Sequence, residues 1–187
     1  MISQVKICFK HQARIDGRKT IRFLKGINVI VGPNGSGKSS LLEAIYRCSD
    51  CKKDFDKNTK YHYFNSETMN PHRFPHRFKG LAGSVIRVRA MFSSHGETMR
   101  DVLRNFKFSP GDCFLLDEPE AGHDLEWIIK IYKGLKRINH LGCQIIIASH
   151  HSVFLSNVNI IELKRGYLKK IMNLERKYVN HDNKRIK

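Results

Sequence analysis

The residues with the clearest chemical content form the segment GPNGSGKSS, residues 32 to 40. It fits the pattern G-x-x-x-x-G-K-[ST], in which glycines let backbone N–H groups turn toward the phosphates of a nucleotide. In this pattern Lys38 reaches the β- and γ-phosphates, while the Ser39 hydroxyl binds Mg²⁺. The segment also lies between the apolar run INVIV (27–31) and a helical pattern that starts at about Lys38, where the mechanism requires it. The sequence therefore predicts a nucleoside triphosphate site made of Gly32, Pro33, Asn34, Gly35, Ser36, Gly37, Lys38, Ser39 and Ser40.

A second group of candidate residues lies in CFLLDEPEAGHD, residues 113 to 124. Four apolar residues end in Asp117, which would complete the coordination of Mg²⁺ from the tip of a buried strand. Glu118 follows directly and is placed to orient or deprotonate an attacking water. The alternative is a strand that ends in a solvated turn, and the order and spacing of the two motifs argue against it.

A third segment, QIIIASHHS (144–152), ends a buried strand pattern in two histidines. An imidazole there could hydrogen-bond to the γ-phosphate and sense its loss. A histidine found alone in such a place would usually be structural. After the two preceding motifs we predict that His150 contacts the γ-phosphate, with His151 as the alternative.

Together, the glycine-rich loop, LLDEPE and the strand ending in histidine resemble the ABC-type ATPase class. Within that class they resemble the heads of SMC, Rad50 and RecF-like proteins, and above all small stand-alone bacterial or phage ATPases without a coiled-coil arm. The class carries a signature motif, usually L-S-G-G-Q/E, shortly before the strand that ends in the metal-binding aspartate. This chain offers SSHGET (93–98), in which Ser94, Gly96 and Glu97 match and His95 departs from the first glycine.

The resemblance implies further roles between about Val5 and Leu163, and it is weakest over residues 66–93. Asp124 in EAGHD matches the acid of the D-loop, and Glu67 is the candidate for the metal-associated Q-loop position. In this class two chains clamp two ATP molecules between them, each glycine-rich loop facing the partner's signature helix. The resemblance thus implies ATP and Mg²⁺ as cofactors, and an ATP-dependent homodimer or hetero-oligomer that opens when ATP is hydrolysed through Glu118.

The elements that must position these residues alternate between strand and helix patterns. We expect strands in QVKICFK (4–10, with Val5, Ile7 and Phe9 inward), in TIRFLKGINVIVG (20–32, two strands), and over 60–65, 112–117 and 143–149. Helices are expected from about Lys38, over 97–106 and over 125–138, and NIIELKRGYLKKI (159–171) is expected to form a closing hairpin. The fold class is α/β: a P-loop NTPase of the ABC-type ATPase head kind, with a mostly parallel central sheet and an N-terminal antiparallel β ribbon.

The length of 187 residues predicts one domain, which we place at residues 1–171. Its signature-bearing subregion spans about 66–108. Residues 172–187 are expected to form a basic, poorly ordered tail. No apolar run approaches the ~20 residues of a membrane helix, and the N-terminus lacks the apolar core of a secretory signal, so we expect a soluble cytoplasmic protein without a membrane partner.

The 34 Lys and Arg residues outnumber the 17 Asp and Glu residues and give a formal net charge of +17. A polyanionic partner, DNA above all, is the simplest explanation, because each cation that neutralises a phosphate releases a condensed counterion. The alternatives are a basic surface that binds nothing, or an acidic protein partner. A nuclease or another effector protein is a further candidate partner.

The five cysteines are odd in number and scattered, which favours reduced thiols over a disulfide framework. CSDC (48–51) is a single C-x-x-C without a second pair, so by itself it does not predict a zinc site. His72 and His76 in HRFPHRF (72–78) could bind a metal, but a loop that touches nucleic acid or a partner is the preferred reading.

Three other functions compete with a DNA-associated ATPase. A transporter's ATP-binding subunit would normally show a complete signature and a glutamine in the Q-loop, and it would gain little from the basic charge. A small nucleotide or metabolite kinase would lack the signature. The third is a binding module that depends on ATP but barely hydrolyses it.

Overall fold

The computed structural model describes residues 1–56, 58–66 and 108–182. Its centre is a five-stranded sheet in the order β5-β6-β7-β3-β8. The four neighbouring pairs in this sheet all run parallel. The strands are β3 (Ile27–Val31), β5 (Tyr61–Asn65), β6 (Cys113–Asp117), β7 (Gln144–Ala148) and β8 (Asn159–Glu162). Every residue of β6 and β7 is buried, which is why both strands are almost continuously apolar. The predicted α/β architecture with a mostly parallel sheet is confirmed.

A second sheet of three antiparallel strands, in the order β2-β1-β4, contains the N-terminus. It consists of β1 (Ile2–Lys6), β2 (Thr20–Arg22) and β4 (Lys52–Phe55), so the predicted antiparallel ribbon is confirmed and gains a strand. The sequence of β4, KKDF, has too few apolar residues to predict a strand. The inward position predicted for Phe9 is wrong, because the chain leaves the strand after Lys6. Phe9 begins the short helix α1 (Phe9–Gln12) and is 89% exposed.

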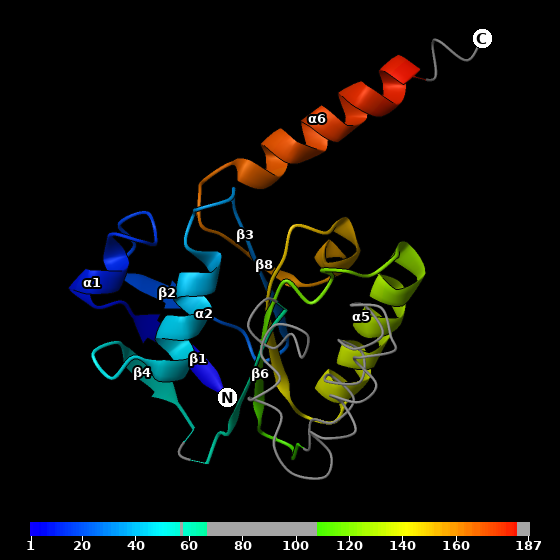
Figure 1. Cartoon of the computed structure of the whole chain (residues 1–187). Coiled ribbons are helices and arrows are strands. Elements are labelled where there is room, and N and C mark those ends of the chain that lie inside the picture. The colour runs from blue at the N-terminus through cyan, green and yellow to red at the C-terminus, as the bar shows by residue number, and fades with distance from the viewer. Residues whose placement is uncertain (57, 67–107, 183–187) are drawn as a thin grey trace, which may run out of the picture.

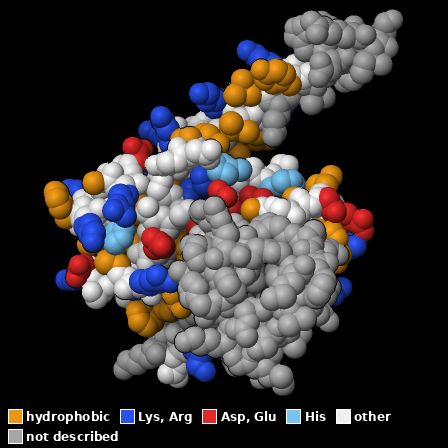
Figure 2. Space-filling view, viewed as in Figure 1, with side chains coloured by type: hydrophobic (Ala, Val, Ile, Leu, Met, Phe, Trp, Pro, Cys, Tyr) orange, Lys and Arg blue, Asp and Glu red, His pale blue; other side chains and the backbone are white. Residues whose placement is uncertain are grey.

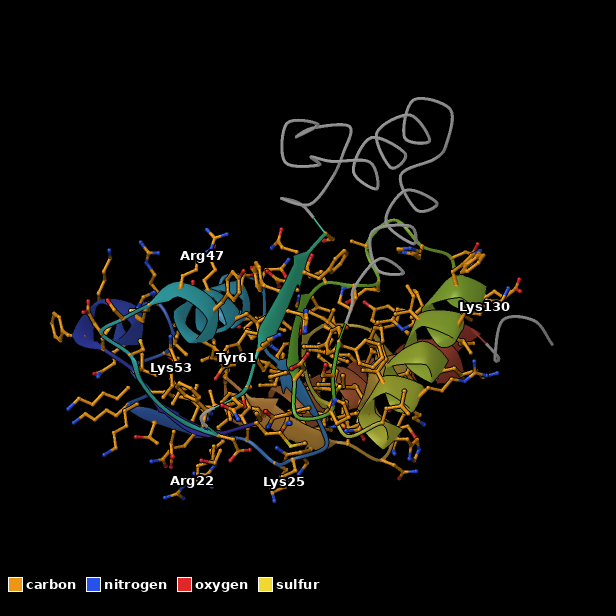
Figure 3. The ribbon with its side chains drawn as sticks, turned by 90° about the horizontal axis from the view of Figure 1, so that it is seen from below. Arg22, Lys25, Arg47, Lys53, Tyr61 and Lys130 are labelled. Atoms are coloured by element: carbon orange, nitrogen blue, oxygen red, sulfur yellow. The ribbon has the colours of Figure 1, made fainter. Side chains whose placement is uncertain are left out.

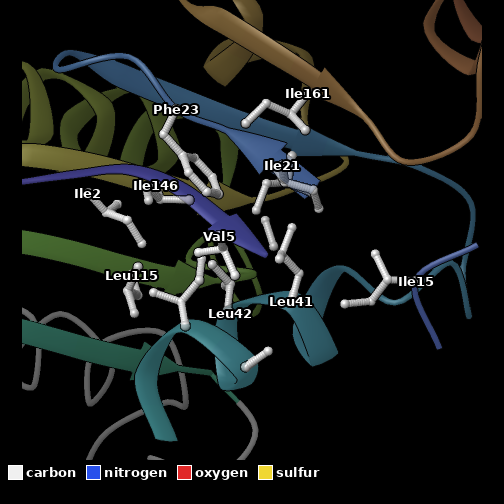
Figure 4. Packing of buried hydrophobic residues seen from close by; sticks show 14 of the residues in the cluster. Ile2, Val5, Ile15, Ile21, Phe23, Leu41, Leu42, Leu115, Ile146 and Ile161 are labelled. Atoms are coloured by element: carbon white, nitrogen blue, oxygen red, sulfur yellow. The ribbon is translucent and has the colours of Figure 1, made fainter. Parts of the chain in front are cut away.

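Helix α2 (Lys38–Arg47) lies between the two sheets. Its apolar face, which contains Leu41, Leu42 and Ile45, packs into one hydrophobic cluster with residues of both sheets, among them Val5 and Leu115. Figure 4 shows Leu41 and Leu42 of α2 meeting Val5 and Leu115 from the two sheets. The core on this side therefore fixes the position of the helix that follows the glycine-rich loop.

The opposite face of the parallel sheet is covered by α5 (Leu125–His140) and the short 3-10 helix η2 (Ser152–Leu155) (Figure 1). Ile128, Tyr132 and Leu135 of α5 form a second cluster with Phe114 and Phe154. The Tyr132 hydroxyl donates a hydrogen bond of 2.8 Å to the Ser156 carbonyl and so joins α5 to the end of η2. Within the described residues, no helix combines the length and the apolar character that crossing a membrane requires.

The C-terminal segment differs from the predicted hairpin. After β8 the chain forms α6 (Tyr167–Asp182), a helix that extends away from the body (Figure 1). Both oxygens of the Glu162 carboxylate accept hydrogen bonds at its start, from the N–H groups of Gly166 and Leu168, each at 2.9 Å. The predicted hairpin is wrong. By accepting N–H groups that have no partner at the start of a helix, the Glu162 carboxylate favours a helix over a second strand. Met172, where we expected a poorly ordered tail to begin, lies inside this helix.

The predicted helix over 97–106 lies outside the described residues.

Candidate nucleotide-binding site

Those predicted site residues that the structure describes meet at one edge of the parallel sheet, where β3, β5, β6 and β7 end. The carboxyl ends of parallel strands are the usual place for ligands in open α/β sheets. The glycine-rich loop follows β3, Asp117 ends β6, and His150 follows β7. An open pocket of about 500 Å³ at this edge is lined by Ala13, Arg14, Asn34, Gly35, Gly37, Lys38, Ser39, Ser40 and Glu118.

The loop after β3 has the backbone that its glycines predict. Gly35 and Gly37 have φ angles of 75° and 89°, in the left-handed region that favours glycine. A Cβ atom on Gly37 would overlap the carbonyl oxygen of Arg14, so no other residue fits there. Gly37 caps the N-terminus of α2, whose free N–H groups therefore face the pocket. The Ser36 hydroxyl oxygen is buried and has no hydrogen-bond partner among the described residues. These features fit a bound phosphate group.

Lys38 is buried where the glycine-rich loop joins the first turn of α2. Its ammonium group donates hydrogen bonds to the carbonyl oxygens of Gly32 at 3.0 Å and Pro33 at 3.3 Å. Burial lowers the pKa of Lys38, although the nearby carboxylates of Glu118, Asp117 and Glu120 oppose the change. A cation held in this partly desolvated place is attracted strongly to an anion that enters the pocket.

Ser39 and Asp117 lie together although they are far apart in the sequence. The Ser39 hydroxyl donates to Asp117 Oδ1 at 3.1 Å, and the Asn65 side-chain amide donates to Oδ2 at 2.7 Å. Asp117 is only 2% exposed. Burial raises its pKa to about 6, while the bonds from Ser39 and Asn65 act in the opposite direction. A hydroxyl next to a buried carboxylate supplies the oxygen ligands that Mg²⁺ prefers, so the residues present fit this metal.

Glu118 and His150 face each other beside this pair. His150 Nε2 lies 3.8 Å from Glu118 Oε1. Glu118 has a φ angle of 48°, uncommon for a residue with a side chain, and its N–H donates to the Ala148 carbonyl at 2.9 Å. Burial, followed by the charge of Lys38, lowers the pKa of His150 against the opposing effect of Glu118 and Glu120. The neutral imidazole is therefore favoured at neutral pH.

His151 has a different environment. Its Nδ1 accepts a hydrogen bond of 3.3 Å from the Val153 N–H and so caps η2. Its ring also lies against Phe154 with a centroid distance of 6.4 Å. Of the two histidines, His150 is the one that faces the acidic residues of the site.

The sequence reasoning did not single out Glu120, Asn65 or Arg14. Glu120 Oε1 accepts hydrogen bonds from the Ser149 hydroxyl at 2.6 Å and from the His150 N–H at 3.1 Å, so it joins the loops after β6 and β7. Asn65 could have been found, because it ends the predicted strand next to the one that ends in Asp117. Arg14 had no signal, since only the packing of the loop after α1 brings it to the pocket.

Four predicted site residues, Glu67, Ser94, Gly96 and Glu97, lie outside the described residues. Asp124, matched above to the D-loop acid, is the N-cap of α5. Its carboxylate accepts a hydrogen bond of 2.9 Å from the Trp127 N–H.

Comparison with known proteins supports the class suggested by this geometry. Residues 8–185 match a family model described as an AAA domain. The zinc import ATP-binding protein ZnuC of Chromohalobacter salexigens is 29% identical over 166 residues, which cover 75% of this chain and 69% of that protein. The ZnuC of Pasteurella multocida is matched over 66% of its length, so this chain spans about two thirds of these relatives.

Shorter and more similar matches come from two DNA repair proteins. The DNA replication and repair protein RecF of Psychromonas ingrahamii is 61% identical over 36 residues, or 19% of this chain and 10% of RecF. The DNA double-strand break repair Rad50 ATPase of Pyrococcus abyssi is 52% identical over 44 residues, or 24% of this chain and 5% of Rad50.

Among solved structures, a putative ABC transporter ATP-binding protein from Pyrococcus furiosus aligns with a TM-score of 0.52 at 17% identity. The alignment covers 78% of this chain and 88% of that one. The ADP conformation of an ATP-binding cassette of an ABC transporter aligns with a TM-score of 0.53 at 15% identity and covers 87% of each chain. At such identities the likeness shows the fold. The family match over residues 8–185 places this chain in the AAA domain family. Together with the RecF and Rad50 matches and the shared fold, it identifies the chain as an ABC-type ATPase related to the SMC, Rad50 and RecF proteins.

Proposed function

We propose that this chain binds and hydrolyses ATP with Mg²⁺, closes as a dimer around ATP, and acts as a motor or switch on DNA or on a partner that acts on DNA. ABC-type ATPases use ATP with Mg²⁺. The observation that carries the ATPase part is the meeting of Lys38, Ser39, Asp117, Glu118 and His150 at one sheet edge.

Each of these residues has a distinct task in the proposal. Bound ATP supplies the phosphoryl group that is transferred to water. The loop N–H groups and Lys38 hold the phosphates, and Ser39 with Asp117 holds the metal ion. Glu118 accepts the proton of the attacking water, as its place next to the metal ligand suggests. His150 hydrogen-bonds to the γ-phosphate, which its neutral imidazole can do through Nε2 or Nδ1.

The class to which the chain belongs supports the dimer, because ABC-type ATPases dimerise with ATP. The second half of each composite site would come from Ser94, Gly96 and Glu97 of a partner chain. Loss of the γ-phosphate then removes a ligand shared by both halves, so hydrolysis would open the dimer. The partner chain in the dimer is a second copy or a related ATPase. A nuclease or other effector would respond to the closing and opening of this dimer.

Basic charge supports DNA as the polyanion. Lys and Arg side chains lie along α6 with hydrophobic side chains between them (Figure 2). Other basic residues, among them Arg22, Lys25, Arg47 and Lys53, project from several sides of the molecule (Figure 3). A charge spread in this way favours contacts to the phosphate backbone, which carry no sequence information.

A second candidate function is the ATP-binding subunit of a transporter. The ZnuC relative supports it, because its match covers 75% of this chain and the RecF match covers 19%. The net charge of +17 favours the DNA-associated function, since a subunit that binds only ATP and a protein partner has no evident use for it.

Gel shifts with duplex and single-stranded DNA at two salt concentrations, with and without ATP, separate these two functions. We expect binding that does not depend on sequence, is tighter with ATP, and falls by about 10³-fold from low to physiological salt if about six phosphates are contacted. The variant Lys169→Glu/Lys170→Glu on α6 should bind more weakly than Lys130→Glu/Lys133→Glu on α5, which changes the net charge equally. Absence of binding at low salt in either state would remove DNA from the proposal and leave the ATPase standing.

The variant Glu118→Gln tests hydrolysis and dimerisation together. The amide keeps the shape of the carboxylate but cannot accept a proton, so turnover should fall by about 10²- to 10⁴-fold while ATP binding remains. Light scattering should then show a dimer that persists in ATP, and DNA binding should tighten further. A variant that remains monomeric in ATP would contradict the dimer, and one with unchanged turnover would contradict the role of Glu118.

A further inference from the structure

Four side chains with metal-binding atoms gather away from the nucleotide pocket. They are Cys8, His11, Cys48 and Cys51, and their ligand atoms all lie within 4.8 Å of one another. Cys8 and His11 form a C-x-x-H at the start of α1, while Cys48 and Cys51 form a C-x-x-C at the C-terminal end of α2. The single C-x-x-C of the sequence thus has a second pair of ligands, which the fold supplies from about forty residues away.

The distances from Cys8 to Cys48 and from Cys51 to His11 are close to those of a tetrahedral site, while Cys8 and His11 lie about 0.5 Å closer together than such a site requires. Zn–S bonds of about 2.3 Å and Zn–N bonds of about 2.05 Å imply S···S edges of about 3.8 Å and S···N edges of about 3.6 Å. Cys8 Sγ lies 3.9 Å from Cys48 Sγ and 3.1 Å from His11 Nδ1, and Cys51 Sγ lies 3.8 Å from His11 Nδ1. One ion of this size can therefore reach all four atoms with little movement of the chain.

A backbone donor also lies against one of the four ligand atoms. The Cys8 N–H donates to Cys51 Sγ at 3.4 Å, and a donor of this kind stabilises negative charge on sulfur. All five cysteines of the chain are free, and the separation of Cys8 from Cys48 is well beyond an S–S bond length of about 2.05 Å. The cluster is therefore not a disulfide seen in its oxidised form.

We propose that Cys8, His11, Cys48 and Cys51 bind one Zn²⁺ as a structural Cys₃His site. Thiolate and imidazole ligands in a tetrahedral arrangement select zinc over Mg²⁺ or Ca²⁺. Four protein ligands leave no open position, which is the mark of a structural rather than a catalytic zinc. The ion would tie the segment between β1 and β2 to the C-terminal end of α2.

This tie has a consequence for the pocket at the other end of α2. The chain continues from His11 to Ala13 and Arg14, which line the pocket, and the Arg14 carbonyl lies against Gly37 of the glycine-rich loop. Zinc would hold this segment in place on α2 and thereby fix Arg14 beside the loop. The metal site itself does not depend on the proposed function, because metal content is measured without nucleotide.

The first test is the metal content of the full chain, purified in reducing buffer without chelators and measured by elemental analysis. We expect about one zinc per chain in the wild type and a loss of at least tenfold in Cys48→Ser/Cys51→Ser. The matched control is Cys143→Ser, which removes a buried thiol outside the cluster and should keep its zinc. Circular dichroism shows whether each variant is folded.

The second test uses Co²⁺ as the probe in wild-type protein stripped of metal. Co²⁺ should produce the visible absorption of a tetrahedral thiolate site, and Zn²⁺ should bleach it. His11→Ala should weaken Co²⁺ binding at least tenfold, whereas His11→Cys should restore it with absorption shifted toward that of a four-thiolate site. A wild-type chain that is isolated without zinc and gives no such absorption with Co²⁺ would overturn the proposal, as would zinc retained fully by both Cys48→Ser/Cys51→Ser and His11→Ala.

Discussion

The two ends of α2 carry two different kinds of site. At its N-terminal end, a loop of consecutive residues offers backbone N–H groups and Lys38 to an anion. At its C-terminal end, Cys48 and Cys51 meet Cys8 and His11 from another segment and offer soft ligands to a cation. The residues of the glycine-rich loop are consecutive in the sequence. The residues of the cysteine and histidine cluster come from two segments that only the fold brings together.

The comparison shows what each site needs from the fold. The glycine-rich loop obtains its geometry from its own glycines and needs only β3 before it and α2 after it. The cysteine and histidine cluster needs α1 to lie against the end of α2. Ile7 and Ile15, which flank α1, bring this about by packing into the hydrophobic core around Leu41 and Leu42. A metal there would in turn stabilise that packing.

The largest effect is expected at the N-terminal end of α2. Lys38→Ala should weaken ATP binding by about 10²-fold or more, because the phosphates lose the charge-assisted hydrogen bonds of a partly desolvated cation. Titration with a fluorescent ATP analogue measures this, and Lys133→Ala on the exposed side of α5 is the control for the loss of one positive charge. Equal ATP affinity in Lys38→Ala and Lys133→Ala would show that the loop does not hold phosphate. The zinc content should be the same in both variants, because neither substitution touches the cysteine and histidine cluster.

The next effect concerns the buried carboxylate of Asp117. Its pKa, raised to about 6, lies above the unfolded value of about 3.9, so its ionised form destabilises the fold above pH 6 and this penalty disappears as the pH falls toward 4. Asp117→Asn should therefore stabilise the nucleotide-free, metal-free protein at pH 7.5 by roughly 2 kcal/mol. The gain should fall to about a third of this value at pH 4.5, because the carboxyl group of the unfolded chain is then partly protonated. Thermal unfolding in a chelator at the two pH values measures it.

Asp112, just before the same strand, provides the matched control with the opposite sign. Burial opposes its ionisation, but hydrogen bonds from His62 at 2.8 Å and from the Ser109 N–H at 2.9 Å lower its pKa overall. Its contribution to stability is present above the unfolded pKa and is lost as the pH falls through the lowered value. Asp112→Asn should therefore destabilise the protein at pH 7.5. If Asp117→Asn and Asp112→Asn changed the free energy of unfolding in the same direction at pH 7.5, the surroundings of the two carboxylates would not differ as described.

The smallest effect tests whether the two ends of α2 are coupled. Loss of the metal in Cys48→Ser/Cys51→Ser should weaken ATP binding only a few-fold, about 1 kcal/mol or less, because Arg14 loses its fixed position while Lys38 and the loop remain. His11→Cys with Zn²⁺ should bind ATP as the wild type does. If the double variant lost as much affinity as Lys38→Ala, the cluster would belong to the nucleotide site, and if it lost none, the two sites would be independent.

The sequence by itself determined the features that depend on neighbouring residues. Continuous apolar runs predicted β3, β6 and β7, because strands buried on both faces need apolar side chains at every position. The glycine-rich loop was predictable because its glycines reach backbone angles that other residues reach at a cost. Asp117, Glu118 and His150 were expected near one another because each lies at the end of a strand, or just after one, in a sheet predicted to be mostly parallel.

Only the tertiary structure decided the features that join distant segments. It placed Cys8 and His11 against Cys48 and Cys51, and it placed Arg14 against Gly37, since no local pattern says which surfaces of α1 and α2 will pack. It also decided that the helix α6 and not a second hairpin strand follows β8, because the carboxylate of Glu162 at the end of β8 accepts two N–H groups at the start of that helix. Short-range preferences limit what a segment can become, but contacts between segments carry the free energy that selects among those possibilities.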